Sequence, residues 1–200
     1  MNKKLLVTLS AAGLLAFSPA TNGPLPIGSS LPKADAKIMD ISGQTISLGE
    51  AKKKNGLLVM FSCNTCPVVR AYQERTRQIC QYAQEHELGV VLLNSNEGSR
   101  SGGDSYQDMQ SYAKKQSYQW FYAVDKDDIL ANAFGANRTP ECFLFDANSK
   151  LVYHGAIDDS PGNPEQVRRQ HLKEAISEML DGKEVSIKES RSIGCSIRRS

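Results

Sequence analysis

The feature that most constrains this chain is a pair of cysteines, Cys63-Asn64-Thr65-Cys66, between an apolar run at residues 56–61 and Pro67, which opens a helical pattern. A strand that leads directly into a helix is the setting in which Cys-x-x-Cys is a redox pair rather than half of a zinc site. Unpaired N–H groups and the dipole at a helix N-terminus favour a thiolate there. We therefore expect Cys63 to be an exposed nucleophile and Cys66 a more buried resolving partner in a redox-active disulfide.

Apolar runs and helical patterns alternate along the rest of the chain. We expect strands over 37–40, 45–48, 89–93, 120–124, 142–145 and 151–154, and helices over 67–87, 106–115, 128–134 and 164–180. Residues 21–32 are predicted to lack structure of their own, and a strand near 185–187 is predicted in an otherwise irregular tail. This alternation predicts an α/β sandwich with a mixed sheet, and it puts the cysteine pair at the carboxyl end of a strand.

The N-terminus has the pattern of a secretory signal peptide over residues 1–20. Lys3 and Lys4 precede an apolar stretch, and Ser18-Pro19-Ala20 supplies small residues at a cleavage site. An uncleaved anchor is the alternative, although the stretch is short for a membrane span. Cleavage would leave one domain, 21–200, without a stable span, in a compartment that permits disulfides, and a bacterial periplasm is the expected one. The full chain has a formal net charge of +2, and Lys3 and Lys4 are the only charged residues within 1–20, so the mature chain has a formal net charge of zero. A neutral chain gives no electrostatic reason to expect nucleic-acid binding.

The sequence resembles the thioredoxin-like superfamily, in particular the redoxin branch with its alkyl hydroperoxide reductase and thiol-specific antioxidant domains. The segments that carry the resemblance are residues 61–67 around the cysteine pair, Asn94-Ser95-Asn96, Thr139-Pro140, residues 158–164 and Gly194-Cys195-Ser196-Ile197. It implies a three-layer sandwich with a central mixed sheet and thiol–disulfide exchange without a cofactor. Its implied partners are protein thiols or disulfides and a redox partner protein.

The resemblance further implies that Thr139-Pro140 is a cis turn that faces the cysteine pair and shapes a substrate groove. Two features depart from thioredoxins. The chain goes directly from Phe61 through Ser62 to Cys63, and the preceding strand contains no acidic residue. Glu141 is a candidate proton acceptor in place of that acid, or else a solvated residue at the start of a strand.

Five cysteines are an odd number, so at least one is free or paired outside the chain. Cys80 lies within a helical pattern and Cys142 on a strand, and we interpret both as buried structural thiols. Cys195 lies in a polar, basic tail with little core to offer. Three roles remain open for Cys195: a second resolving thiol, a disulfide partner that fixes the tail, or an unpaired thiol.

Two other functions remain open. A thiol-dependent peroxidase would oxidise Cys63 with peroxide and resolve it with Cys66 or Cys195, although no Pro-x-x-x-Thr precedes Cys63. A Cu(I) metallochaperone of the Sco type would use Cys63, Cys66 and His154, because Cu(I) favours thiolates with an imidazole. The cysteine spacing of that class is usually one residue longer. The default interpretation of His154 is a hydrogen-bonded residue at a strand edge.

Overall fold

The computed structural model describes residues 23–199, and the predicted signal peptide lies outside this range. Within it, every helix is too short or too polar to cross a membrane. Residues 23–32, predicted to lack structure, pack on the body of the protein instead. Leu31 is buried and donates its N–H to the carbonyl of Ser149, and Leu25 donates to the carbonyl of Phe134. Their apolar side chains and backbone groups find partners in the core that local sequence does not reveal.

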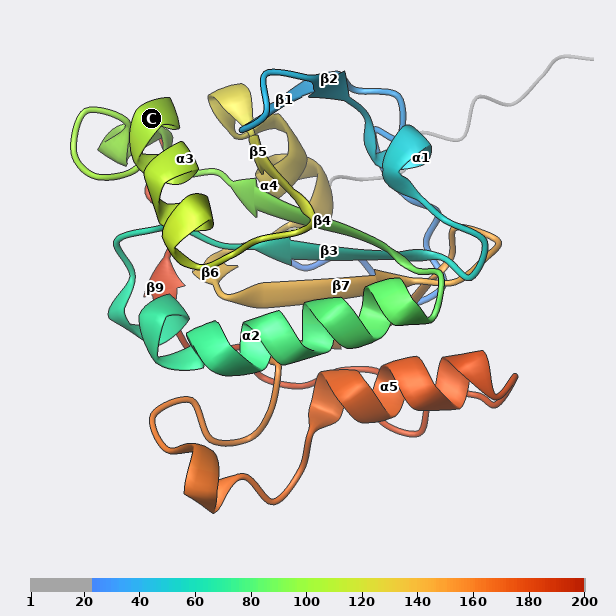
Figure 1. Ribbon diagram of the computed structural model, residues 1–200. Helices are drawn as coiled ribbons and strands as arrows, with labels where there is room; N and C mark the ends of the chain where they lie inside the picture. The colour runs from blue at the N-terminus through green and yellow to red at the C-terminus, as the bar shows by residue number, and fades with distance from the viewer. Residues whose placement is uncertain (1–22, 200) are drawn as a thin grey trace, which may run out of the picture.

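A mixed sheet of seven strands forms the centre of the molecule (Figure 1). The strand order is β2-β1-β5-β4-β3-β7-β8, in which β3, β4 and β5 are parallel and the other pairings are antiparallel. The strands are β1 (Ile38–Asp40), β2 (Thr45–Ile46), β3 (Leu57–Phe61), β4 (Gly89–Asn94), β5 (Phe121–Val124), β7 (Glu141–Phe145) and β8 (Leu151–Gly155). A second, two-stranded sheet pairs β6 (Arg138–Thr139) with β9 (Cys195–Ser196).

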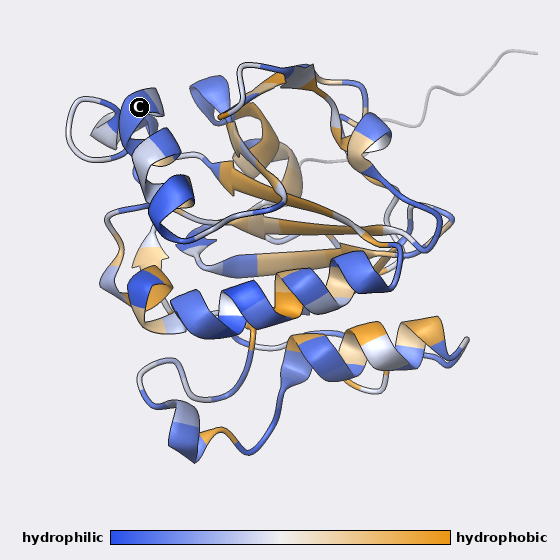
Figure 2. Cartoon of the chain, in the orientation of Figure 1, coloured by the Kyte–Doolittle hydropathy of each residue, from blue (hydrophilic) through white to orange (hydrophobic). Residues whose placement is uncertain are grey.

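Helices cover both faces of the large sheet. The helices are α1 (Leu48–Ala51), α2 (Pro67–Glu85), α3 (Tyr106–Lys115), α4 (Ile129–Phe134) and α5 (His171–Leu180). Helices α2, α3 and α5 share one apolar cluster with Leu58 and Met60 of β3, and α1 and α4 share the other with Leu57, Val59 and Phe61. Alternate residues of β3 therefore serve opposite cores. The central strands are mostly hydrophobic and the outer helix surfaces mostly hydrophilic (Figure 2). The predicted three-layer sandwich is confirmed.

The last predicted helix, 164–180, is interrupted. A short 3-10 turn, Pro164–Gln166, precedes an extended segment, and α5 begins only at His171. The carboxylate of Asp159 accepts hydrogen bonds from the N–H groups of Arg168 and Arg169 at 3.0 and 3.2 Å. These bonds hold residues 167–170 out of the helix and explain why the prediction was wrong.

The strand predicted near residues 185–187 was also wrong. Val185 buries its side chain in the core beside α5. The N–H of Ser186 donates a hydrogen bond to the carboxylate of Glu178 instead of to the carbonyl of a neighbouring strand. The strand of the tail is β9, ten residues later. In Figure 1 it lies beside β6, close to where α2 begins.

Candidate thiol site

The cysteine pair occupies the turn between β3 and α2. Ser62 continues the pairing of β3, with its N–H donating to the carbonyl of Leu93 at 2.8 Å. Cys66 is the N-cap residue of α2, and Pro67 takes the first helical position, where a missing N–H costs least. Cys66 thus lies at the positive end of the helix dipole, and Cys63 lies one turn before it.

Three sulfur-bearing residues meet at this turn. A disulfide joins Cys66 to Cys195, with Cα atoms 6.0 Å apart, and Cys63 is a free thiol. Sγ of Cys63 lies 3.4 Å from Oγ1 of Thr139, and Sγ of Cys66 lies 3.4 Å from the Thr139 carbonyl oxygen. The structure therefore holds a pairing other than the predicted one between Cys63 and Cys66.

Cys63 was expected to be exposed, and this expectation is wrong. Cys63 is 1% exposed, and Cys66 is 2% exposed. Both pack with Val69 in a small cluster against which Val68 and Cys195 lie. The C-terminal tail contributes to this cover, and its approach to the cysteine pair was not visible from local sequence.

Thr139 and Pro140 are joined by a cis peptide bond, as the resemblance implied. Thr139 lies on β6 and pairs with Cys195 of β9, in antiparallel register. Glu141 follows directly and is buried, so its interpretation as a solvated residue is wrong. Its Oε2 accepts hydrogen bonds from the N–H groups of Asn137 and Arg138 at 2.7 and 2.9 Å. Glu141 thus holds the start of β6 in place.

A buried carboxylate that the sequence analysis missed, Asp104, fixes the two residues between the cysteines. Its Oδ1 accepts a hydrogen bond from the N–H of Asn64 at 2.8 Å, and its Oδ2 accepts one from Oγ1 of Thr65 at 2.8 Å. Nδ2 of Asn94 and Nδ2 of Asn96 donate to the same carboxylate. The conformation of the cysteine turn is therefore set by a residue 40 positions later in the chain.

A second layer supports this network. Oδ1 of Asn64 accepts a hydrogen bond from the hydroxyl of Tyr122, and its carbonyl accepts one from Nε of Arg70. Arg100 donates through Nη1 to the side chain of Asn94 and to the carbonyl of Asp104. The motif Asn94-Ser95-Asn96 was the visible signal for this region, whereas Asp104 lies in a glycine-rich loop without periodicity.

The remaining cysteines, Cys80 and Cys142, lie in the core, as predicted. Both side chains are fully buried in the cluster beneath α2 and α5. Burial raises the pKa of the Cys80 thiol, and burial also raises that of Cys142 well above its ordinary value. Neither is poised for thiolate chemistry.

His154 is engaged elsewhere. Its Nε2 lies 2.8 Å from Oε1 of Glu141, and its ring stacks on Phe143 with centroids 4.5 Å apart. Over residues 23–199 no three His, Cys, Asp or Glu side chains are grouped so as to hold a metal ion. The Cu(I) alternative, which needs His154 beside both sulfurs, has no support in this arrangement.

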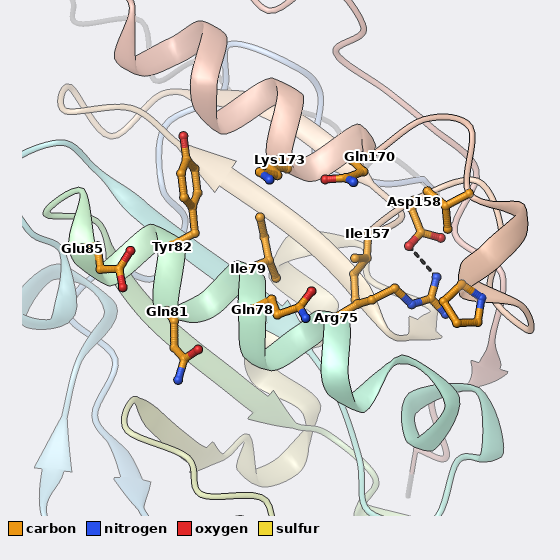
Figure 3. A pocket seen from close by; sticks show the side chains of 12 residues that line it. Arg75, Gln78, Ile79, Gln81, Tyr82, Glu85, Ile157, Asp158, Gln170 and Lys173 are labelled. Carbon is orange, nitrogen blue, oxygen red and sulfur yellow. Dashed lines mark hydrogen bonds and ion pairs between the residues drawn. The ribbon is translucent and has the colours of Figure 1, made fainter.

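A cavity of about 560 Å³ lies between α2 and α5 (Figure 3). At one end Arg75 pairs with Asp158, with Nη1 2.5 Å from Oδ2, and donates to the carbonyls of Ser160 and Pro161. These bonds tie the 158–161 loop to α2. No cysteine lines the cavity, so we assign it no part in thiol chemistry.

Comparison with known proteins agrees with this fold. The family model described as Redoxin matches residues 26–170. A hypothetical protein from Sinorhizobium meliloti 1021 is 33% identical over 88% of this chain and 96% of its own, with a TM-score of 0.80. An uncharacterized conserved protein from Geobacillus kaustophilus is 30% identical, with coverages of 88% and 93% and a TM-score of 0.80.

A more distant structure shares the fold alone. A secreted disulfide oxidoreductase from Mycobacterium tuberculosis, homologous to DsbE of E. coli, is 14% identical, with coverages of 72% of this chain and 96% of its own and a TM-score of 0.54. No protein of curated function matches the sequence. These findings confirm the predicted thioredoxin-like fold and redoxin relationship.

Proposed function

The chain belongs to the Redoxin family, and we propose that it is an exported thiol–disulfide oxidoreductase with Cys63 and Cys66 as its redox pair. The observation that carries the proposal is the meeting of three sulfur-bearing residues at Thr139. One sulfur is free, two are joined, and Cys66 lies at a helix N-terminus. The N-terminal pattern of lysines, apolar residues and small residues supports export.

In this proposal Cys63 is the nucleophile. The Thr139 hydroxyl lies 3.4 Å from its sulfur, within reach to donate a hydrogen bond to the attacking thiolate. The thiolate attacks a substrate disulfide and forms a mixed disulfide, which Cys66 then resolves. In this proposal the substrate cysteine binds beside Thr139 and Pro140. Electrons come from a redox partner protein, and no cofactor takes part.

Substitution of each motif cysteine tests this role. With a protein disulfide such as that of insulin as substrate, Cys63→Ser should lose exchange, and Cys66→Ser should accumulate mixed disulfides that mass spectrometry can assign to Cys63. Cys80→Ala is the matched control, because it removes a buried free thiol from α2, the helix that Cys66 caps. Full activity of Cys63→Ser would overturn the proposal.

A peroxidase is the second candidate, and the cover over Cys63 favours it, because a 1% exposed thiol admits a peroxide more easily than a protein. In the reduced protein, peroxide would oxidise Cys63 to a sulfenic acid. The thiol of Cys66 or Cys195 would then condense with that sulfenic acid, release water and form a disulfide. Consumption of hydrogen peroxide with dithiothreitol as reductant separates the two candidates. A peroxidase would turn over peroxide at a rate that falls to background in Cys63→Ser, whereas an oxidoreductase would show background rates in both proteins.

A further inference from the structure

The C-terminal strap, residues 188–199, is attached to the body of the protein on both sides of Cys195. Before it, the N–H of His154 donates to the carbonyl of Lys188 at 2.9 Å, and the N–H of Ser190 donates to the carbonyl of His154 at 3.0 Å. After it, the N–H of Ile197 donates to the carbonyl of Asn137 at 3.0 Å, and Ile197 is buried in the core. The strap therefore has anchors that do not depend on the disulfide.

The strap fits closely against β6. Cys195 pairs with Thr139 in the two-stranded sheet, and Gly194 lies against the same residue. A Cβ atom at Gly194 would lie 2.1 Å from the Thr139 carbonyl oxygen, a distance that no side chain tolerates. Cys195 is thus held at one position over the thiol turn, and its sulfur stays within exchange range of Cys66 when their bond opens.

Exposure distinguishes the three cysteines. Cys63 and Cys66 are almost fully covered, whereas Cys195 is partly exposed on β9. An external protein thiol therefore reaches the cluster first at Cys195. The Redoxin match ends at residue 170, so the strap lies beyond the region that defines the family.

We propose that Cys195 is a resident third redox thiol, through which reducing equivalents pass between an external protein dithiol and the covered Cys63–Cys66 pair. This inference rests on the proposed function of that pair. After Cys63 and Cys66 have reduced a substrate, they are joined as a disulfide. The Cys195 thiolate then attacks Sγ of Cys66, the Cys66–Cys195 bond forms, and Cys63 leaves as a thiolate and takes a proton from solvent. This state is the one that the structure holds.

Reduction completes the cycle. A thiolate of the external dithiol attacks Sγ of Cys195, the donor–Cys195 bond forms, and Cys66 leaves as a thiolate that is then protonated. The second thiol of the donor attacks the donor's own sulfur and releases Cys195 as a thiol. The donor departs as a disulfide, so two electrons have entered the protein.

The position of a trapped adduct tests the first contact. Oxidised Cys63→Ser protein, which keeps the Cys66–Cys195 bond, is treated with a thioredoxin that lacks its resolving cysteine, and the adduct is mapped by mass spectrometry. We expect the probe on Cys195, with Cys66 free. An adduct on Cys66, or none, overturns the inference.

Reduction kinetics supply the second test. With intact reduced thioredoxin as donor, oxidised Cys195→Ser should be reduced at least about tenfold more slowly than the wild type, because a pre-held thiol acts at an effective concentration in the millimolar range or above. Gly194→Ala, which displaces Cys195 without removing it, should be slowed in the same direction. Gly162→Ala is its control, because a Cβ there meets nothing within 4 Å.

The outcomes separate the two proposals. If Cys195→Ser is reduced at the wild-type rate while Cys63→Ser has lost exchange, the inference fails and the proposed function stands. If Cys63→Ser retains full exchange, the proposed function fails, and the adduct position still reports whether Cys195 is the first sulfur that a donor meets.

Discussion

Two groups of cysteines in this molecule are covered to a similar degree and differ in the polar groups that lie beside them. Cys63 and Cys66 are 1% and 2% exposed, and Cys80 and Cys142 are 0% exposed. The first two lie among a helix N-terminus, the hydroxyl and carbonyl of Thr139, and a third cysteine. The other two lie among apolar side chains that raise their pKa. The comparison teaches that polar groups and a neighbouring disulfide, rather than exposure, distinguish the two thiols proposed for redox chemistry from the two core thiols.

The largest expected difference is in alkylation of the reduced, native protein. At pH 8, iodoacetamide should label Cys195 at least about a hundredfold faster than Cys80 or Cys142, because buried thiols with raised pKa carry little thiolate and little access. Mass spectrometry of a quenched time course measures each site. Similar rates at Cys195 and Cys142 would show that the three-cysteine cluster at Thr139 is no more open to reagents than the apolar core.

The next effect concerns the network that shapes the redox turn. Asp104→Ala leaves the donors of Asn64, Thr65, Asn94 and Asn96 without their carboxylate acceptor. We expect a loss of about 3 kcal/mol or more in the free energy of unfolding, since each bond to a charged group contributes about 1.5–3 kcal/mol. Urea denaturation measures it, with the exposed Asp35→Ala as control. Equal stability of the two variants would show that the network does not hold the turn.

The same substitution at two covered cysteines sharpens the comparison. Cys142→Ser places a hydroxyl among apolar groups and should cost about 1–3 kcal/mol of stability. Cys63→Ser should cost less, because Oγ1 of Thr139 is already within hydrogen-bond reach of that position. Thermal unfolding of both reduced variants provides the measurement. A larger loss for Cys63→Ser than for Cys142→Ser would contradict the assignment of polar surroundings to Cys63.

The smallest effect is a dependence of stability on alkaline pH. Burial raises the pKa of Tyr118 and Tyr153, which share the core with Cys80 and Cys142, and raises the pKa of Tyr112 to about 12. Above pH 10 the unfolded chain loses tyrosine protons before the folded one does. The unfolded state then binds fewer protons, so stability falls as pH rises. The urea concentration at the midpoint of unfolding should be lower at pH 11 than at pH 9. An unchanged midpoint would argue against the raised pKa values.

Local patterns in the sequence predicted much of the fold. The helix over 106–115 was predicted with the bounds that the structure has, because the signals that set a helix of this kind are local; the structure adds a capping box at Ser105 and Asp108. The route from β3 through the cysteines into α2 was predicted for the same reason. The break before α5 was missed, because it depends on hydrogen bonds from Asp159 across the loop to Arg168 and Arg169.

The candidate site was predicted in part. Cys63, Cys66 and Thr139-Pro140 followed from the motif and the family resemblance, and the structure brings them together. The partner of Cys66 lies 129 residues away in a polar tail without hydrophobic periodicity, so no local pattern pointed to β9. Asp104 was missed for a similar reason, since a buried carboxylate in a glycine-rich loop looks solvated until its partners are known.

The central claim is that redox chemistry is confined to one of the two groups of cysteines. The most direct measurement equilibrates the protein in glutathione buffers of graded potential, quenches with acid and maps every disulfide by mass spectrometry. The account predicts a two-electron transition that involves only Cys63, Cys66 and Cys195, with Cys80 and Cys142 reduced at every potential. A disulfide that contains Cys80 or Cys142, or five reduced thiols throughout, would contradict it.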